Sequence, residues 1–311
     1  PMPTPCILGH EPAGIVEAVG SDVKDFKPGD HVIGCLNAWC GTCNYCLTGR
    51  PHLCLPPEML ARLDGTSRLS KDGAPIVQFA LSSFAENMLT HERALVKIKD
   101  EMPLDRAALI GCGVTTGIGA ALRTAKVEPG ATTAIIGCGG VGLSALQGCR
   151  IAGAGRIIAV DTMDWKLELA RDLGATDVVN AANGDPVAQV QELTGGGVDY
   201  AFECIGLKQT AEQAWGMIGM GGTAVIVGMM PFGEKVEIPG YEIFMQEKTL
   251  KGSMMGSNQF RKDMPQYCNM YLDGRLMLDE MVSQHIKLEE INVGYEAMQR
   301  REGTRTVIDF D

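Results

Sequence analysis

Clusters of lysine or arginine are absent from the sequence, in which 27 basic side chains are outnumbered by 38 acidic ones. The resulting net charge of -11 would repel phosphate backbones, so we expect no nucleic-acid partner. An unbroken apolar run is also missing. One nearly uncharged stretch, residues 131–149, is long enough to be checked as a membrane span, but it contains several glycines and follows a Pro-Gly pair. Such a stretch favours a strand, a tight turn and a buried helix, so no membrane partner is expected.

The start of the sequence has no basic segment followed by an apolar one, so nothing in it indicates export. Without export, the 11 cysteines are not expected to form a disulfide framework. They fit metal binding in a reducing compartment, and we expect a cytoplasmic protein. The chain has 311 residues, of which 45% are hydrophobic and 21% charged, as is typical of a globular protein with two domains.

Short β-like runs and turn signals predict a small, mostly β domain over residues 1–113. The runs "GIVEAVG" (14–20) and "DHVIGCL" (30–36) flank a turn at 27–30, and residues 84–98 add further extended segments. Between them, residues 55–78 are rich in proline, glycine and charged residues. We expect a long surface loop there.

From residue 114 to about residue 254, compact apolar runs alternate with stretches of helical spacing. The run "RIIAVD" (156–161) fits a buried strand, and "MDWKLELARDLG" (163–174) fits a helix that ends at a glycine. This alternation predicts βαβ units and a doubly wound α/β domain around a parallel sheet. Residues 255–311 contain one helical stretch and a last extended piece, and we expect them to return to the first domain.

A glycine-rich turn, "GCGGVG", follows the first strand of this α/β domain and opens its first helix. Gly137 permits the tight turn, Gly139 lets a pyrophosphate approach the backbone, and Gly142 allows the helix to pack closely on the sheet. Free N–H groups at the helix start, from Gly140 onward, would bind the phosphates. Two alternatives to a dinucleotide site are a glycine turn that binds no ligand and a turn that binds S-adenosylmethionine.

An acidic residue, Asp161, ends the next strand. At that place a carboxylate accepts hydrogen bonds from the adenosine ribose and repels a 2′-phosphate, which predicts NAD rather than NADP as the cofactor.

Four cysteines are spaced C-x2-C-x2-C-x7-C within residues 40–54. Four thiolates on one short lobe can close a tetrahedral shell around zinc, and a closed shell leaves no position for a substrate. Free or disulfide-bonded cysteines are the alternative. The spacing therefore predicts a structural zinc site formed by Cys40, Cys43, Cys46 and Cys54.

Together, "GHEPAG" (9–14), the four-cysteine lobe, "GCGVTTG" (111–117), "GCGGVG" and Asp161 resemble the zinc-containing, NAD-dependent medium-chain alcohol dehydrogenases. The likeness covers essentially the whole chain in the family's order. It implies a Rossmann domain over residues 114–254 that binds NAD, and a GroES-like catalytic domain formed by residues 1–113 and 255–311. It also implies hydride transfer between an alcohol or aldehyde and NAD, a catalytic zinc and, from the long loop after Cys54, a homodimer.

The resemblance also implies roles for single residues. His10 and Cys112 match ligands of the catalytic zinc, and Glu11 matches an acidic neighbour that can approach the metal. The other matches are Thr116 beside the nicotinamide, Val141 and Val227 packing on the cofactor, Lys166 near the adenosine ribose, Arg305 pairing with the pyrophosphate, and Leu36, Leu53 and Met59 lining an apolar substrate pocket.

Simpler interpretations exist for the two zinc ligands. A histidine at a strand end often bonds to backbone, and a cysteine between glycines can be a small buried apolar residue. Because His10 adjoins Glu11 and Cys112 is available, we favour the ligand interpretation.

The family's catalytic domain begins about sixty residues earlier, with a C-x-[DST]-x-H segment that supplies a further zinc thiolate and the proton relay. Since the sequence starts at Pro1 and lacks that segment, we expect it to be part of a longer chain. Cys6 or Cys35 would be the substitutes for the thiolate. These residues alone are expected to bind NAD and the structural zinc but to oxidise alcohols poorly.

The substrate is predicted to be a primary or aromatic alcohol, or the matching aldehyde. One alternative is a glutathione-dependent formaldehyde dehydrogenase, which acidic Glu58 after the lobe disfavours. Another is a non-catalytic fragment that binds zinc and NAD.

Overall fold

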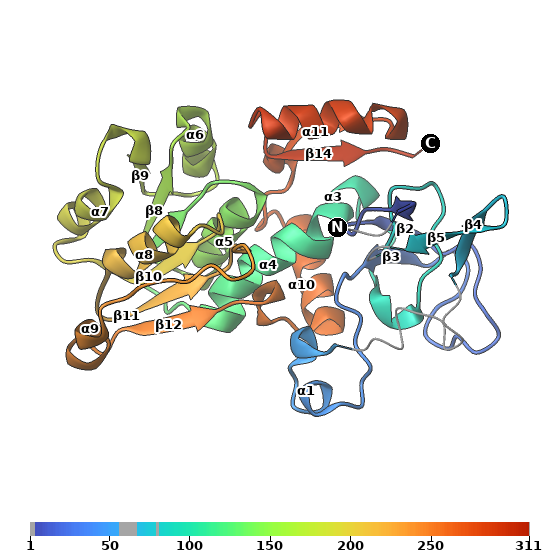
Figure 1. The fold of residues 1–311 in the computed structure, drawn as a ribbon, viewed down its shortest axis with the longest axis horizontal. Helices are drawn as coiled ribbons and strands as arrows, with labels where there is room; N and C mark the ends of the chain where they lie inside the picture. Colours follow the sequence, from blue (N-terminus) through green and yellow to red (C-terminus); the bar gives the residue numbers. More distant parts are fainter. Residues whose placement is uncertain (1–3, 56–66, 79–80, 311) are drawn as a thin grey trace. The chain divides into compact units, whose positions relative to one another are not determined.

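The computed structural model describes residues 4–55, 67–78 and 81–310 (Figure 1). The chain forms two compact units, one made of Pro1–Cys112 with Asn258–Asp311 and the other of Gly113–Ser257. The sequence-based boundaries followed residues 113 and 254. We call these the metal unit and the nucleotide unit, after the sites described below.

A six-stranded parallel sheet forms the centre of the nucleotide unit, in the order β12-β11-β10-β7-β8-β9. In chain order this is 6-5-4-1-2-3, the doubly wound arrangement, with its switch point between β7 and β10. The strands are β7 (Thr132–Ile136), β8 (Arg156–Asp161), β9 (Asp177–Asn180), β10 (Val198–Glu203), β11 (Ile218–Ile226) and β12 (Thr249–Gly252). The predicted Rossmann fold is confirmed.

Helices connect these strands and pack on the sheet (Figure 1). They are α5 (Gly140–Ala152), α6 (Asp164–Asp172), α7 (Pro186–Thr194), α8 (Lys208–Met217) and the short α9 (Gly240–Met245). Right-handed crossovers put α5 and α6 on one face and α7 and α8 on the other, and α7 and α8 contact each other.

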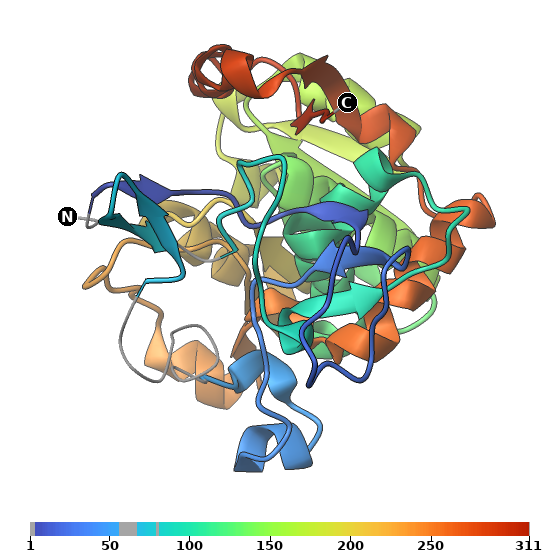
Figure 2. The same cartoon turned by 90° about the vertical axis from the view of Figure 1, so that its right-hand side faces the viewer.

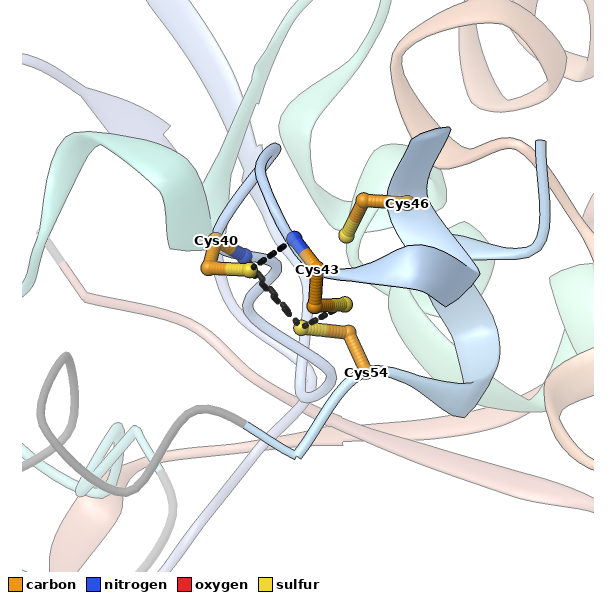
Figure 3. A group of neighbouring side chains, drawn as sticks. All are labelled: Cys40, Cys43, Cys46 and Cys54. Carbon is orange, nitrogen blue, oxygen red and sulfur yellow. Dashed lines mark hydrogen bonds between the residues drawn. The ribbon is translucent and has the colours of Figure 1, made fainter. Parts of the chain in front are cut away.

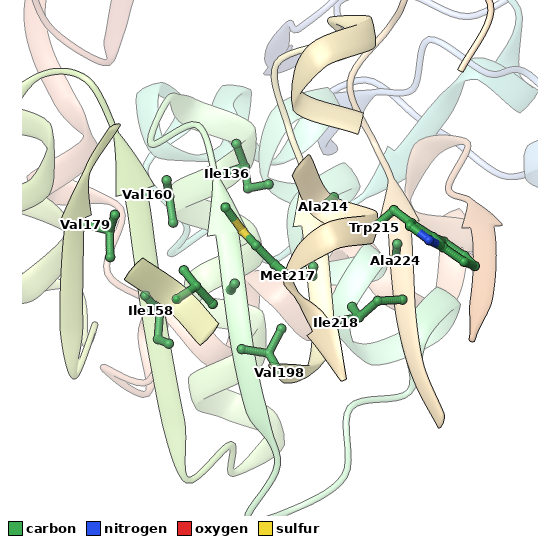
Figure 4. Close-up of a cluster of buried hydrophobic side chains, with 13 residues drawn as sticks. Ile136, Ile158, Val160, Val179, Val198, Ala214, Trp215, Met217, Ile218 and Ala224 are labelled. Carbon is green, nitrogen blue, oxygen red and sulfur yellow. The ribbon is translucent and has the colours of Figure 1, made fainter. Parts of the chain in front are cut away.

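Alternate strand residues bury one apolar layer under α7 and α8 (Figure 4). Ile136, Val160 and Ala224 come from three strands, while Ala214 and Met217 come from α8, and all five are at most 2% exposed. Side chains of a strand alternate between faces, so each buried strand has a second apolar set on its other side. This two-sided burial explains the continuous apolar runs of the sequence.

The stretch 131–149 folds as predicted, into β7, a tight turn and the start of α5. A different stretch, Leu104–Ala125, is long and apolar enough to cross a membrane by length and composition. Its apolar window is 72% buried inside the protein, as is also found in core helices. This helical stretch combines α3 (Leu104–Leu109), α4 (Thr115–Gly119) and two π-helical segments, 110–114 and 120–125.

The metal unit contains small sheets, as expected of a GroES-like domain. The central one is antiparallel and orders β2-β3-β6, with Ile33 opposite both Ala13 and Val96. Two others order β1-β5-β4 and β13-β14. The strands are β1 (Cys6–Ile7), β2 (Ala13–Ile15), β3 (His31–Gly34), β4 (Leu69–Lys71), β5 (Ala74–Gln78), β6 (Leu95–Lys97), β13 (Val282–Ile286) and β14 (Arg305–Ile308).

The helices of the metal unit include α1 (Asn44–Leu47) in the cysteine lobe, α10 (Phe260–Leu272) and α11 (Ile291–Gln299). Figure 2 shows α1 and its flanking loop extending away from the strands of the same unit. Short 3₁₀ turns complete the unit at 51–53, 92–94, 279–281 and 288–290.

Three local expectations for this unit were wrong. Part of the expected loop 55–78 is a hairpin, since β4 and β5 pair around an Asp72-Gly73 turn, while residues 56–66 lie outside the described residues. Within the expected extended segment 84–98 the only described strand is 95–97. The C-terminal part has a second helix, α11, and a further strand, β13. Strands of three to five residues and a single two-turn helix carry too little periodicity to stand out from a sequence.

Candidate functional site

Four sulfur atoms converge in the cysteine lobe (Figure 3). The ligand atoms of Cys40, Cys43, Cys46 and Cys54 all lie within 4.8 Å of one another. The Sγ atom of Cys54 is 3.6 Å from that of Cys40 and 3.7 Å from that of Cys43. A tetrahedral zinc ion with Zn–S bonds of about 2.3 Å requires S–S separations of about 3.8 Å. The lobe therefore has the dimensions of a structural zinc site.

Backbone amides of the lobe prepare it for an ion. The amides of Thr42 and Cys43 donate to Cys40 Sγ at 3.4 and 3.2 Å, and the amide of Cys40 donates to Cys54 Sγ at 3.3 Å. Hydrogen bonds from the Thr42 hydroxyl and from the amides of Thr42 and Cys43 lower the pKa of Cys40 to about 6, which favours its thiolate form. Burial raises the pKa of Cys54 to about 12. Bound zinc would supply the charge that keeps this second sulfur deprotonated.

A second donor cluster lies in the metal unit, where the ligand atoms of His10, Glu11 and Cys112 are within 4.8 Å of one another. An imidazole and a thiolate are typical zinc ligands, whereas magnesium and calcium prefer oxygen. The three side chains are partly buried. The cluster therefore fits a zinc site that a small molecule can reach.

Close backbone contacts bring these three residues together. Gly9 bonds to the Ser83 amide, and a Cβ on Gly9 would lie 2.5 Å from Ser83 Oγ, so the chain before His10 is held tightly. On the other side, a Cβ on Gly111 would meet the Gly34 carbonyl at 3.0 Å and the Glu11 Cα at 3.5 Å. Cys112 follows in a π-helical segment, a feature frequent at functional sites.

Arg305, the first residue of β14, forms an ion pair with Glu11 through its Nη2 atom. Both side chains are 24% exposed. The resemblance had assigned Arg305 to a pyrophosphate, and that role stays a prediction. The ion pair also means that Arg305 balances the negative charge of Glu11, the carboxylate beside His10 and Cys112, within the metal unit.

The glycine-rich turn lies at the carboxyl end of β7, beside the switch point of the sheet. Gly137 has φ 93°, in the left-handed region. A Cβ on Gly142 would overlap the carbonyl oxygen of Gly137, so only glycine fits there. A Cβ on Gly139 would meet no atom of the described residues within 4 Å. Close packing therefore explains why residue 142 is glycine. Gly139 instead faces open space at the start of α5, which begins with Gly140 and Val141.

Asp161 lies next to this turn at the end of β8. Its Oδ2 accepts the amide of Cys138 at 2.8 Å, and its Oδ1 accepts the amides of Thr162 and Met163 at 2.8 and 3.1 Å. These bonds fix the carboxylate and use three of its roughly four acceptor positions. A carboxylate held in this way can still accept a hydrogen bond from a ribose hydroxyl.

Comparison with known proteins identifies the family. The profile described as "Alcohol dehydrogenase GroES-like domain" matches residues 1–100, and "Zinc-binding dehydrogenase" matches residues 140–271. The class-3 alcohol dehydrogenase of Myxine glutinosa is 41% identical over 320 residues, covering 98% of this chain and 83% of that protein. The chain belongs to the zinc-containing medium-chain alcohol dehydrogenases. It is therefore an NAD-dependent zinc enzyme that interconverts alcohols and aldehydes, as the motifs predicted.

Two solved structures of alcohol dehydrogenases have the same fold. An alcohol dehydrogenase zinc-binding domain protein from Burkholderia ambifaria is 36% identical with a TM-score of 0.95, covering 100% of this chain and 85% of that one. Benzyl alcohol dehydrogenase from Acinetobacter calcoaceticus is 33% identical with a TM-score of 0.91, covering 100% and 86%.

The remaining predicted residues of this dehydrogenase lie in both units. In the nucleotide unit, the buried Thr116 hydroxyl donates to Met255 Sδ at 3.6 Å, Lys166 lies over the Trp165 ring at 5.6 Å, and Val227 follows β11. In the metal unit, Leu36 precedes the cysteine lobe in the sequence and Leu53 adjoins Cys54, and both leucines are half-buried. Met59 is outside the described residues. The roles of all these side chains stay predictions.

Sequence reasoning missed one buried acidic residue, Glu203 at the end of β10, which is 0% exposed. The signal was a glutamate directly after the apolar run of a predicted strand, in "DYAFECIG". A charged residue in that position is rarely buried without a specific task.

Gly139→Ala and Gly142→Ala should have opposite effects. The Gly142 variant should lose about 2 kcal/mol of unfolding free energy, because its methyl group overlaps the Gly137 carbonyl. The Gly139 variant should keep its stability but bind NADH at least about tenfold more weakly, because its methyl group fills the phosphate approach. Urea unfolding and fluorescence titration with NADH measure the two effects. Equal losses of stability in both variants would contradict this assignment.

Cys43→Ser should remove one zinc ion per chain from the dehydrogenase, because three thiolates and a hydroxyl bind zinc far more weakly than four thiolates. Elemental analysis of the purified protein measures the zinc content. The matched control is Cys149→Ser, on α5 of the nucleotide unit, which should keep its zinc. An unchanged zinc content in Cys43→Ser would show that the lobe is not a metal site.

Proposed function

We propose that this dehydrogenase oxidises a primary or aromatic alcohol with NAD, using a zinc ion held by His10 and Cys112. The observation that carries the proposal is the convergence of His10, Glu11 and Cys112 within 4.8 Å, with Glu11 paired to Arg305. Zinc, when bound there, supplies a Lewis acid that makes an alcohol more acidic.

Charge balance at this cluster favours the deprotonated form of an alcohol. A neutral imidazole and one thiolate leave a net positive charge on a divalent cation. Glu11 would cancel part of that charge, but Arg305 neutralises its carboxylate. The chain thus keeps a positive potential where the hydroxyl loses its proton, and hydride transfer is easiest from the resulting anion.

Asp161 supports the choice of NAD over NADP. Its carboxylate is fixed by three backbone amides beside the glycine-rich turn and cannot swing away from a 2′-phosphate without breaking them. A phosphate there would meet like charge.

Apolar side chains support the substrate class. Leu36, shortly before the cysteine lobe, and Leu53, next to its last cysteine, are both half-buried. The likeness to benzyl alcohol dehydrogenase favours an aromatic alcohol. A second candidate substrate is the adduct of formaldehyde with glutathione, since the class-3 alcohol dehydrogenase of Myxine glutinosa is 41% identical.

We also propose a homodimer formed through strand β12. This strand ends the described sheet, so one of its edges has no neighbouring strand there. Large apolar side chains are exposed on β12 and on nearby segments of the same unit: Met220 (81%), Phe232 (109%), Tyr241 (70%), Phe244 (78%) and Leu250 (42%). Such a patch next to a free edge is typical of a surface that a second copy covers. A cytoplasmic location stays a prediction.

His10→Ala and Cys112→Ser should each lower kcat for alcohol oxidation by about a thousandfold or more, because each removes a zinc ligand. NADH binding should stay within about twofold of wild type, because the glycine turn and Asp161 are unchanged. Steady-state assays and NADH titration measure both. Full turnover in Cys112→Ser would refute the proposed metal site.

A substrate panel discriminates the two substrate classes. The enzyme should show a higher kcat/KM for benzyl alcohol than for S-hydroxymethylglutathione, because half-buried leucines complement an aromatic ring and not a charged tripeptide. With either alcohol, NADP should be at least about a hundredfold poorer than NAD. The reverse order of substrates would establish the glutathione-dependent alternative.

Phe244→Glu combined with Leu250→Glu should convert the dimer into a monomer, because it places charges in the apolar surface. Sedimentation velocity gives the mass of the particle. The matched control is Met298→Glu, an equally exposed apolar residue (62%) on α11 of the metal unit, which should leave the dimer intact. A monomeric wild-type enzyme would refute the dimer.

A further inference from the structure

Glu203 is a fully buried carboxylate that the reaction described above does not use. Its Oε1 accepts three hydrogen bonds, from the amides of Ile205 and Gly206 at 2.8 and 2.7 Å and from the Thr210 hydroxyl at 2.8 Å. Its Oε2 has no hydrogen-bond partner among the residues that the structure describes. Burying a carboxylate in this way is costly, so its side chain must be retained for something that an apolar residue would not supply.

The backbone of Glu203 binds a second loop. Its carbonyl oxygen accepts the amides of Val227 and Gly228 at 2.8 and 2.9 Å, directly after β11. One residue thus organises the loop 204–206 through its side chain and the loop 227–228 through its backbone. Loops fixed by charge-assisted bonds to backbone amides keep a single conformation.

The loop 204–206 is packed against the glycine-rich turn on one side and against residues 228 and 229 on the other, without room for a methyl group. A Cβ on Gly137 would lie 2.5 Å from Ile205 Cγ1, and a Cβ on Gly206 would lie 2.5 Å from the Met229 carbonyl. A Cβ on Gly228 would be 2.6 Å from Glu203 Oε2. A shift of one loop therefore displaces the others, and Glu203 sits below the point where they meet.

These loops belong to the second half of the doubly wound sheet. Dinucleotides bind outside the carboxyl ends of the strands, across the switch point, with one mononucleotide on each half. Asp161 and the turn after β7 serve the adenosine half. The loops after β10 and β11 therefore face the nicotinamide half.

We propose that Glu203 is a positioning residue for the nicotinamide half of NAD, acting through the loops 204–206 and 227–228. This rests on the NAD binding described above. It differs from a general role in stability, because a stability role would affect both halves of the coenzyme equally. Replacement by glutamine removes the charge that strengthens the bonds from the amides of Ile205 and Gly206. It also puts a bulkier NH2 group on one of the two oxygen positions, and so disturbs these loops.

The test compares the binding of NADH with that of ADP-ribose, which lacks nicotinamide, in the full-length enzyme. Glu203→Gln should raise the Kd for NADH by about tenfold or more and change the Kd for ADP-ribose by less than about twofold. Thr210→Val removes one of the three donors to Oε1 and should show the same selectivity at about threefold. If Glu203→Gln does not fold, Thr210→Val decides the question.

The matched control is Thr194→Val, at the end of α7. That hydroxyl accepts the Gly197 amide at 2.9 Å and donates to the Val190 carbonyl at 2.7 Å, before β10 rather than after it. It should leave both dissociation constants unchanged. Equal weakening of NADH and ADP-ribose by Glu203→Gln, or no weakening of either, would overturn the proposal. Failure of wild-type enzyme to bind either ligand would instead refute NAD binding itself.

Discussion

Close approach of backbone to backbone at the carboxyl edge of the parallel sheet is the constraint on which the nucleotide unit depends. The start of α5 packs so tightly on the turn after β7 that a single methyl group at Gly142 would overlap a carbonyl oxygen. The loop after β10 meets that turn at similarly short range, and the loop after β11 meets the loop after β10. The strands that carry these loops are packed on both faces by apolar side chains, so they cannot shift to let the loops move apart. The coenzyme surface is consequently rigid where the phosphates bind.

Features encoded by neighbouring residues could be predicted from the sequence. The glycine spacing, Asp161 and the four cysteines each lie within a short segment, so their geometry follows from one turn or one lobe. The alternation of strands and helices between residues 131 and 226 was confirmed almost element by element, because each strand is buried on both faces. The hairpin β4-β5 and helix α11 escaped detection because they are short and only partly buried.

Contacts between distant residues could not be predicted. Nothing in "GTRTVI" indicates that Arg305 pairs with Glu11, since an arginine on a short strand is compatible with many partners. The role of Glu203 was hidden for a related reason. Its three donors come from the residues just after it, but only the fold shows that the site is closed to water. Burial is a property of the assembled unit, and a local pattern does not specify it.

The pair of Glu11 and Arg305 joins residues that are 294 positions apart. During synthesis, the segment around His10 leaves the ribosome long before the partner of its neighbouring carboxylate exists. A nascent chain that captured zinc early would do so beside an uncompensated acid, in a more negative and more metal-retentive cluster than that of the finished enzyme. The charge of Glu11 is therefore balanced only when β14, among the last residues to be made, pairs with β13 in the metal unit.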